Sequence, residues 1–171
     1  KQGDGPLIVG ANEGERGELQ GTVPQLANMH SATAKSKTYV YNFAHVPTGW
    51  RTLPCVAFHG LELAYVFGHI PQGLTSPTML YLSGGGGCTT PTPGADQLDV
   101  TVADNTMRMW AAFAKTGNPS VKGLIEWPAY TEQNDQFLYI GQSLQAKKGV
   151  KESFVAPPRK EGEPRPPQNP N

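Results

Sequence analysis

The segment KTYVYNF, from Lys37 to Phe43, decides the expected fold. β-Branched and aromatic residues dominate it with partial alternation, which is typical of a β-strand. Upstream, Pro6 to Gly10 (PLIVG) is a short apolar run ended by glycine, the pattern of a strand covered on both faces. Downstream, Gln136 to Gly141 (QFLYIG) predicts a last short strand.

A first helix is predicted between the two upstream strands, from about Thr22 to Ala34. Leu26, Met29 and His30 share one helical face there at i, i+3, i+4 spacing. Pro24 lies near the expected start of this helix, where the missing N–H of a proline costs no hydrogen bond.

A second helix is predicted from about Thr101 to Thr116, with Thr101 and Asp104 in the S/T-x-x-D pattern of an N-terminal cap. One apolar face is expected to consist of Ala103, Met107, Trp110, Ala111 and Ala114. Gly117 follows as a C-terminal stop.

Strands that alternate with helices favour an α/β sandwich with a mostly parallel sheet. Three strands and two helices make a small core for 171 residues, so we expect the sheet to be completed by residues that this sequence does not contain. The domain is expected over residues 1–155, and the Pro-rich, polar residues 156–171 are expected to form an extended or disordered tail.

Composition excludes several classes of protein. Lys and Arg (14) balance Asp and Glu (14), so there is no electrostatic case for a nucleic acid or an anionic membrane as partner. Glycine (20) and proline (16) make up about a fifth of the chain, against a usual share of about 12%. No apolar run is long enough to span a bilayer. The few histidines lack zinc-type spacing to Cys55 or Cys88, so no metal or other cofactor is expected, and the two cysteines fit either a disulfide or two thiols.

The sequence contains no complete catalytic set. The G-x-S-x-G pattern of a nucleophile elbow is absent, and the nearest serine, Ser83, has Tyr81 where the elbow requires glycine. The run Gly84–Gly87 lacks the Lys-Ser/Thr of a phosphate-binding loop, so we interpret it as a linker.

Among the four histidines, His59 is the candidate for catalysis. Gly60 follows it and lets the backbone turn sharply, which suits an imidazole presented at the edge of a sheet. His30, His45 and His69 are most simply packing or surface residues.

Several motifs, in one order, resemble the C-terminal part of the type-B carboxylesterases, the family that includes the cholinesterases. The matching segments are LIVGANEGE (7–15), YVYNF (39–43), HGLEL (59–63), YVFG (65–68), MWAAFAKTGNP (109–119) and WPAY (127–130). The resemblance implies the C-terminal part of an α/β-hydrolase sheet sandwich that is incomplete without an N-terminal segment. It also implies hydrolysis of small-molecule carboxylic esters by a Ser-His-Glu triad.

Carried onto this chain, the resemblance gives His59 as the triad histidine and Glu15 as the triad acid. Glu13 is the competitor for the acid role, although Glu15 keeps the family's spacing from Asn12. Glu62 is interpreted as structural. Trp50, Tyr65 and Phe67 are candidates for a substrate pocket or for packing, and Trp110 and Phe113 are expected in the core.

Two departures from the family pattern lead us to expect a fragment or subunit that is inactive alone. The serine and its Gly-rich oxyanion loop belong to the family's N-terminal portion, which is expected on a second chain or a missing segment. Glu15 and His59 are only 44 positions apart, much closer than in full-length members. A non-catalytic binding or adhesion domain of the same fold is the alternative, and a flexible Pro/Gly-rich scaffold fits only the tail. Because the family is often exported, a secreted or periplasmic location is favoured over the cytoplasm.

Overall fold

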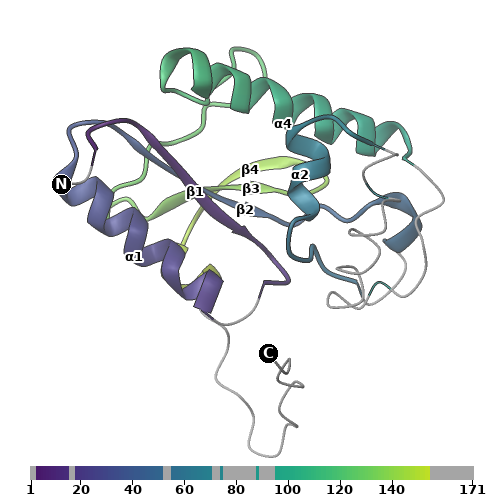
Figure 1. Cartoon of the computed structure of the whole chain (residues 1–171), viewed down its shortest axis with the longest axis horizontal. Coiled ribbons are helices and arrows are strands. Elements are labelled where there is room, and N and C mark those ends of the chain that lie inside the picture. The colour runs from purple at the N-terminus through teal and green to yellow at the C-terminus, as the bar shows by residue number, and fades with distance from the viewer. Residues whose placement is uncertain are drawn as a thin grey trace, which may run out of the picture.

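The computed structural model describes residues 3–15, 18–51, 55–70, 74, 88 and 95–154. Strands and helices alternate along most of it (Figure 1). In chain order the elements are β1 (Leu7–Asn12), α1 (Glu18–Thr33), β2 (Thr38–Phe43), the 3-10 turn η1 (Thr48–Trp50), α2 (Leu61–Val66), α4 (Gln97–Thr116), β3 (Gln136–Ile140), β4 (Leu144–Lys148) and α5 (Val150–Phe154).

The described strands form one sheet in the order β1-β2-β3-β4. β2 pairs in parallel with β1 and with β3, and β4 runs antiparallel to β3. The expectation of a mostly parallel α/β sheet is therefore confirmed. β4 was not expected, because its sequence LQAKK is polar and carries no strand pattern.

Helices cover both faces of the sheet, with α1 on one side and α4 with α2 on the other (Figure 1). β2 is buried on both sides, and its alternate residues supply two separate cores. Tyr39 and Phe43 belong to the core beneath α4, whereas Val40 belongs to the core beneath α1. The aromatic cluster beneath α4 includes Trp110 and Phe113, as expected.

The first helix begins at Glu18, four residues before the predicted start. Pro24 consequently lies inside the helix, not in its first turn. The helical face shared by Leu26, Met29 and His30 is buried only in part: His30 is buried, but Leu26 and Met29 are 42% and 49% exposed. Val23 and Ala27 take their place against the sheet.

The long helix α4 begins at Gln97, so the cap predicted at Thr101 and Asp104 is wrong. Asp96 is the N-cap, and it forms a reciprocal capping box with Asp99. Thr101 lies inside the helix, where its hydroxyl donates to the carbonyl of Gln97. The helix ends at Gly117, as predicted, with the left-handed φ of 74° that glycine tolerates.

The predicted apolar face of α4 is buried only in part. Ala103 is buried, but Met107 is 37% exposed, and Ala111 and Ala114 are also exposed. The fully buried positions of the helix are Asp99, Val102, Ala103, Thr106 and Met109, which form an adjacent stripe. The buried stripe differs because a carboxylate and a hydroxyl occupy two inward positions, and an apolar pattern does not reveal them.

The helices α2 and α5 were not predicted, because helices of six and five residues are too short to show a helical period. Ser83, the run Gly84–Gly87 and the tail 156–171 lie outside the described residues. None of the helices that the structure describes combines the length and hydropathy that a bilayer span needs.

Candidate active site

Both predicted catalytic residues follow strands that run in parallel. β1 ends at Asn12 and leads to Glu15, and β2 ends at Phe43 and leads, through η1, to His59 just before α2. Because the carboxyl ends of parallel strands meet at one edge of a sheet, the two loops come together there. We call residues 12–15 the acid loop and residues 55–60 the histidine loop.

Glu15 and His59 are hydrogen-bonded to each other. Oε1 of Glu15 meets Nδ1 of His59, and the other carboxylate oxygen, Oε2, accepts the backbone N–H of Asn12 at 2.8 Å. The Glu15 side chain is only 9% exposed, whereas the imidazole is 64% exposed. The carboxylate therefore occupies Nδ1 and leaves the ring to face solvent with Nε2 available.

The backbones of the two loops are also joined directly. The N–H of Gly14 donates to the carbonyl of Ala57 at 2.8 Å. A Cβ atom on Gly14 would lie 2.5 Å from the Val56 side chain and 2.8 Å from that carbonyl oxygen. Glycine is therefore required at this position for the loops to approach so closely.

Gly60 provides the sharp turn expected after His59. Its φ is 80°, in the left-handed region that glycine adopts without strain, and it serves as the N-cap of α2. The chain therefore turns into α2 immediately after the imidazole, which stays exposed at the helix start.

The competitor for the acid role, Glu13, is not paired with His59. Its backbone N–H donates to the carbonyl of Phe43 at 2.8 Å. Burial raises the pKa of its carboxyl above the ordinary value of 4.5, and Lys147 partly offsets that rise. The charged partner described for Glu13 is thus Lys147 of β4.

A second carboxyl, that of Glu62, lies beside the pair. It accepts the side-chain amide of Asn12 at 2.5 Å. Burial raises the pKa of Glu62, the Asn12 hydrogen bond lowers it, and the nearby Glu15 carboxylate raises it further, with a net rise. The carboxyl therefore gains its proton more readily than an exposed glutamate.

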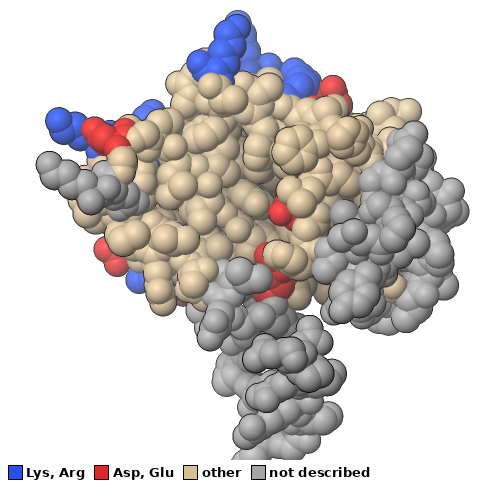
Figure 2. Space-filling model, in the orientation of Figure 1, with Lys and Arg blue, Asp and Glu red and all other residues tan. Residues whose placement is uncertain are grey.

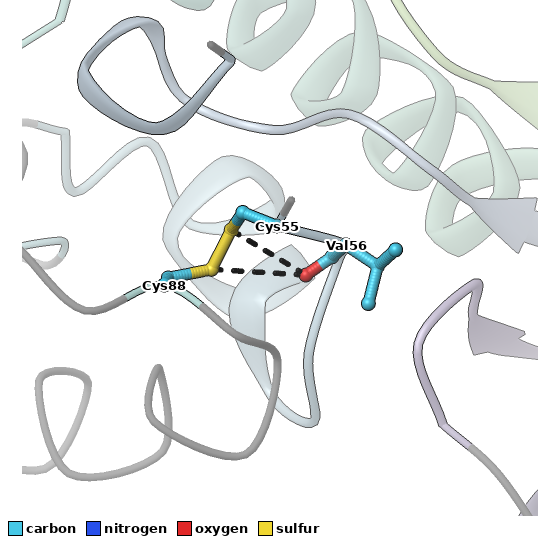
Figure 3. The surroundings of a disulfide bond; sticks show 3 residues. All are labelled: Cys55, Val56 and Cys88. Carbon is cyan, nitrogen blue, oxygen red and sulfur yellow. Dashed lines mark hydrogen bonds between the residues drawn. A yellow bond between two sulfur atoms is a disulfide. The ribbon is translucent and has the colours of Figure 1, made fainter. Parts of the chain in front are cut away.

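The cysteine pair, left open by the sequence, is a disulfide between Cys55 and Cys88 with Cα atoms 4.9 Å apart. Figure 3 shows both sulfur atoms beside the carbonyl oxygen of Val56, at 3.9 and 4.0 Å. The bond fixes the start of the histidine loop four residues before His59, so it restrains the backbone that carries the imidazole.

Sequence reasoning missed a buried carboxylate, Asp99, next to this site. Its side chain is fully buried. It accepts hydrogen bonds from six donors: His45 Nε2, Arg51 Nη2, the Tyr65 hydroxyl, the Thr48 hydroxyl, and the backbone N–H groups of Thr48 and Asp96. We call Asp99 and these five partner residues the Asp99 cluster. Its only sequence signal is the spacing Asp96-x-x-Asp99, which fits a capping box as well as the pair that was predicted.

The Asp99 cluster holds the chain on both sides of His59. Thr48 and Arg51 precede the histidine loop, and Tyr65 lies in α2, which follows it. Burial raises the pKa of Asp99, but the hydrogen bonds from His45 and Thr48 outweigh burial and leave the pKa below its ordinary value of 3.8. The ionised form is thus stabilised in the folded chain.

None of the other histidines is hydrogen-bonded to Glu15 in the part of the chain that the structure describes. His30 is buried, with Nε2 2.9 Å from the Gly5 carbonyl and Nδ1 2.7 Å from the Thr38 hydroxyl. Since a carbonyl only accepts, Nε2 donates to Gly5. His45 is buried in the Asp99 cluster, and His69 is exposed.

Of the pocket candidates, two are packing residues. Trp50 is buried against Phe58, and Tyr65 is buried in the Asp99 cluster. Phe67 is 64% exposed.

Comparison with known proteins identifies the family. The sequence model described as "Carboxylesterase family" matches residues 17–156. The chain belongs to the carboxylesterase family. The match begins at residue 17, two residues after Glu15, so it does not include Glu15. The contact between Glu15 and His59 is therefore a separate observation, made from the geometry of the structure.

Two relatives within the family illustrate the extent of the likeness. The chain is 33% identical to carboxylesterase 1D of Mus musculus over 126 residues, which cover 72% of this chain and 19% of the relative. It is 31% identical to the liver carboxylesterase of Sus scrofa over the same length, again 72% and 19%. The chain therefore spans about a fifth of the length of the curated relatives it matches.

A solved structure, that of a PNB esterase, shows the same fold as this carboxylesterase-family chain. The sequences are 26% identical, the TM-score is 0.56, and the likeness covers 77% of this chain and 22% of the other. The expected fold, part of an α/β-hydrolase sheet, is thus confirmed.

Proposed function

We propose that this chain is the part of a serine carboxylesterase that supplies the triad acid and the triad histidine. The observation that carries the proposal is the Glu15–His59 pair, with a buried carboxylate on Nδ1 and an exposed ring. Membership of the carboxylesterase family supports it, because relatives of this chain are named as carboxylesterases. The substrate class is small-molecule carboxylic esters.

In the proposed reaction, Nε2 of His59 takes the proton from a serine hydroxyl as the serine oxygen attacks the ester carbonyl. The tetrahedral intermediate then expels the alcohol, which receives that proton from the imidazolium, and an acyl-enzyme remains. A water molecule, deprotonated by the same nitrogen, releases the acid and restores the serine. Glu15 keeps the Nδ1–H tautomer and stabilises the imidazolium at both stages. This chemistry requires no cofactor.

The serine lies, in this proposal, on an N-terminal part of the same esterase. β1 supports an attachment point for that part, since among the described strands it pairs only with β2 and no described strand lies along its other edge. Figure 1 has β1 in front, and Figure 2 shows that this face carries few charged residues over its middle. A face with few charged residues and an open strand edge suits burial against more of the sheet.

The extracellular or periplasmic side is the proposed location, and residues 1–155 the proposed domain portion. The Cys55–Cys88 disulfide supports export, because such bonds persist mainly in oxidising compartments. The balanced charge of the chain supports neither a nucleic acid nor an anionic membrane as partner.

The test is a burst assay with p-nitrophenyl acetate on the native protein, after intact-mass analysis and N-terminal sequencing have established which chains it contains. We expect a stoichiometric burst when a serine-bearing part is present, and none from residues 1–171 alone. His59→Gln and Glu15→Gln should abolish or slow the burst, and His69→Gln, a change at an exposed histidine, should not. No burst from the complete protein would leave the non-catalytic binding domain as the better account.

A further inference from the structure

Asn12 contacts Glu15 and the chain on either side of His59. Its backbone N–H donates to Oε2 of Glu15 at 2.8 Å. Its side-chain amide donates to the carbonyl of Phe58 at 2.6 Å and to Oε2 of Glu62 at 2.5 Å. The backbone of Asn12 thus binds the acid, Glu15. Its side chain binds Phe58, immediately before His59, and Glu62, three positions after it.

The geometry requires an asparagine amide at this position. Both neighbours of Nδ2 accept hydrogen bonds, so both hydrogens of the NH₂ group are used and the orientation of the amide is fixed. The side chain is 1% exposed, so water cannot replace it easily. An aspartate would put a third carboxylate against Glu62 and Glu15 and would have no hydrogen for the Phe58 carbonyl.

The bond to Phe58 sets the direction of the backbone that enters His59. The N–H of Gly14 donates to the preceding carbonyl, that of Ala57. The acid loop therefore hydrogen-bonds to two consecutive carbonyl groups, those of Ala57 and Phe58, just before the imidazole. The bond to Glu62 fixes the first turn of α2, on the other side of Gly60. The His59 side chain is itself 64% exposed and has few packing neighbours, so its placement depends on the backbone on either side.

We propose that Asn12 is a positioning residue: its side chain clamps the backbone on both sides of His59, while its N–H orients Glu15. The clamp does not touch the reacting atoms. It limits how far the imidazole moves relative to the carboxylate, and a misplacement of about 1 Å in such a site can cost on the order of 100-fold in rate. The kinetic consequence rests on the proposed function; the effect on the Glu15–His59 hydrogen bond does not.

The test compares Asn12→Ala with Asn42→Ala in the complete protein, the chain together with its serine-bearing part. Asn42 is a matched control, because it is buried on the neighbouring strand and its Oδ1 has no partner among the described residues. The first readout is the NMR signal of the His59 Nδ1–H proton in histidine-labelled protein. We expect this signal to broaden or vanish in Asn12→Ala and to persist in Asn42→Ala.

The second readout is hydrolysis of p-nitrophenyl acetate. We expect Asn12→Ala to lower kcat by about 10- to 100-fold with KM changed less than about threefold, because the substrate pocket is not altered. Wild-type kcat and an unchanged Nδ1–H signal in Asn12→Ala would overturn the proposal. If the complete wild-type protein hydrolyses no ester, the proposed function fails, and the NMR comparison still decides the role of Asn12.

Glu62 provides a second test if Asn12→Ala does not fold. Glu62→Gln keeps an oxygen that accepts from Asn12, so the Nδ1–H signal and kcat should stay near those of the wild type. Glu62→Ala removes one side of the clamp and should weaken both, by about 3- to 10-fold in kcat. Equal behaviour of these two variants would contradict the clamp.

Discussion

Replacement of Asp99 by asparagine should strongly destabilise the folded chain, although it exchanges only one side-chain oxygen for nitrogen. The side chain is fully buried and accepts from six donors, three on each carboxylate oxygen. An asparagine keeps one acceptor oxygen. If that oxygen faces His45, Arg51 and Tyr65, the new NH₂ group faces the backbone N–H groups of Thr48 and Asp96.

The magnitude follows from those contacts. Two buried N–H groups without acceptors cost about 1–3 kcal/mol each. Removal of one charge from a buried ion pair costs about 3–5 kcal/mol. These two costs overlap, and Arg51 keeps a second carboxylate, Asp96, at 2.7 Å. We therefore expect Asp99→Asn to lower the free energy of unfolding by about 3–5 kcal/mol.

The assay is urea denaturation followed by circular dichroism, with Asp104→Asn as the matched control. Asp104 lies on the same helix and pairs with Arg108 at 3.7 Å, but its side chain is 60% exposed, so its loss should cost less than about 1 kcal/mol. The difference in unfolding free energy between the wild type and Asp99→Asn should narrow as the pH falls below about 4. The lowered pKa of Asp99 stabilises the fold fully above the ordinary value of 3.8, and this stabilisation is lost progressively as the pH falls below it. Equal unfolding midpoints for the two variants at pH 7 would refute the reasoning.

Three further predictions concern the loops around His59. Because burial raises the pKa of Glu62 above 4.5, the folded chain holds a proton at a pH where the unfolded chain has lost it. Stability should therefore fall as the pH rises above about 4.5, and Glu62→Gln should flatten this fall in denaturation curves. An unchanged slope would count against it. Gly14→Ala should lower the free energy of unfolding by about 1–3 kcal/mol, because the added methyl group would clash with the histidine loop. Gly21→Ala, whose added methyl group points into open space on α1, should not lower it. Similar melting temperatures for the two variants would argue against the close approach of the acid loop to the histidine loop. Reduction of the Cys55–Cys88 bond, which spans 33 positions, should lower the free energy of unfolding by about 3–4 kcal/mol. Calorimetry with and without dithiothreitol measures this change, and an equal melting temperature in both would contradict it.

Strands β1, β2 and β3 and the turn after His59 were predictable because each depends on a short local signal. β2 is β-branched and aromatic along most of its length, and Gly60 follows the one histidine at a sharp turn. The family resemblance gave Glu15 as the acid, with Glu13 as its competitor. The structure brings Glu15 to His59, which no local pattern could establish.

The Asp99 cluster and the role of Asn12 were not predictable in this way. Asp99 lies in a helical stripe that an apolar pattern would reject, and His45 and Tyr65, which come from a loop and α2, are 54 and 34 positions away. Asn12 meets Phe58 and Glu62 across 46 and 50 positions. The contacts of Asn12 arise from the parallel pairing of β1 with β2, so they become visible only once the sheet is built.

The central claim is that His59, held by Glu15, activates a serine that lies outside these 171 residues. Covalent labelling of the native protein with a fluorophosphonate, followed by peptide mass spectrometry, tests it most directly. The account predicts a label on a serine outside residues 1–171, and a labelling rate that falls by roughly 1,000-fold or more in His59→Gln but not in His69→Gln. A label on a serine within this chain, or a rate that His59→Gln leaves unchanged, would contradict it.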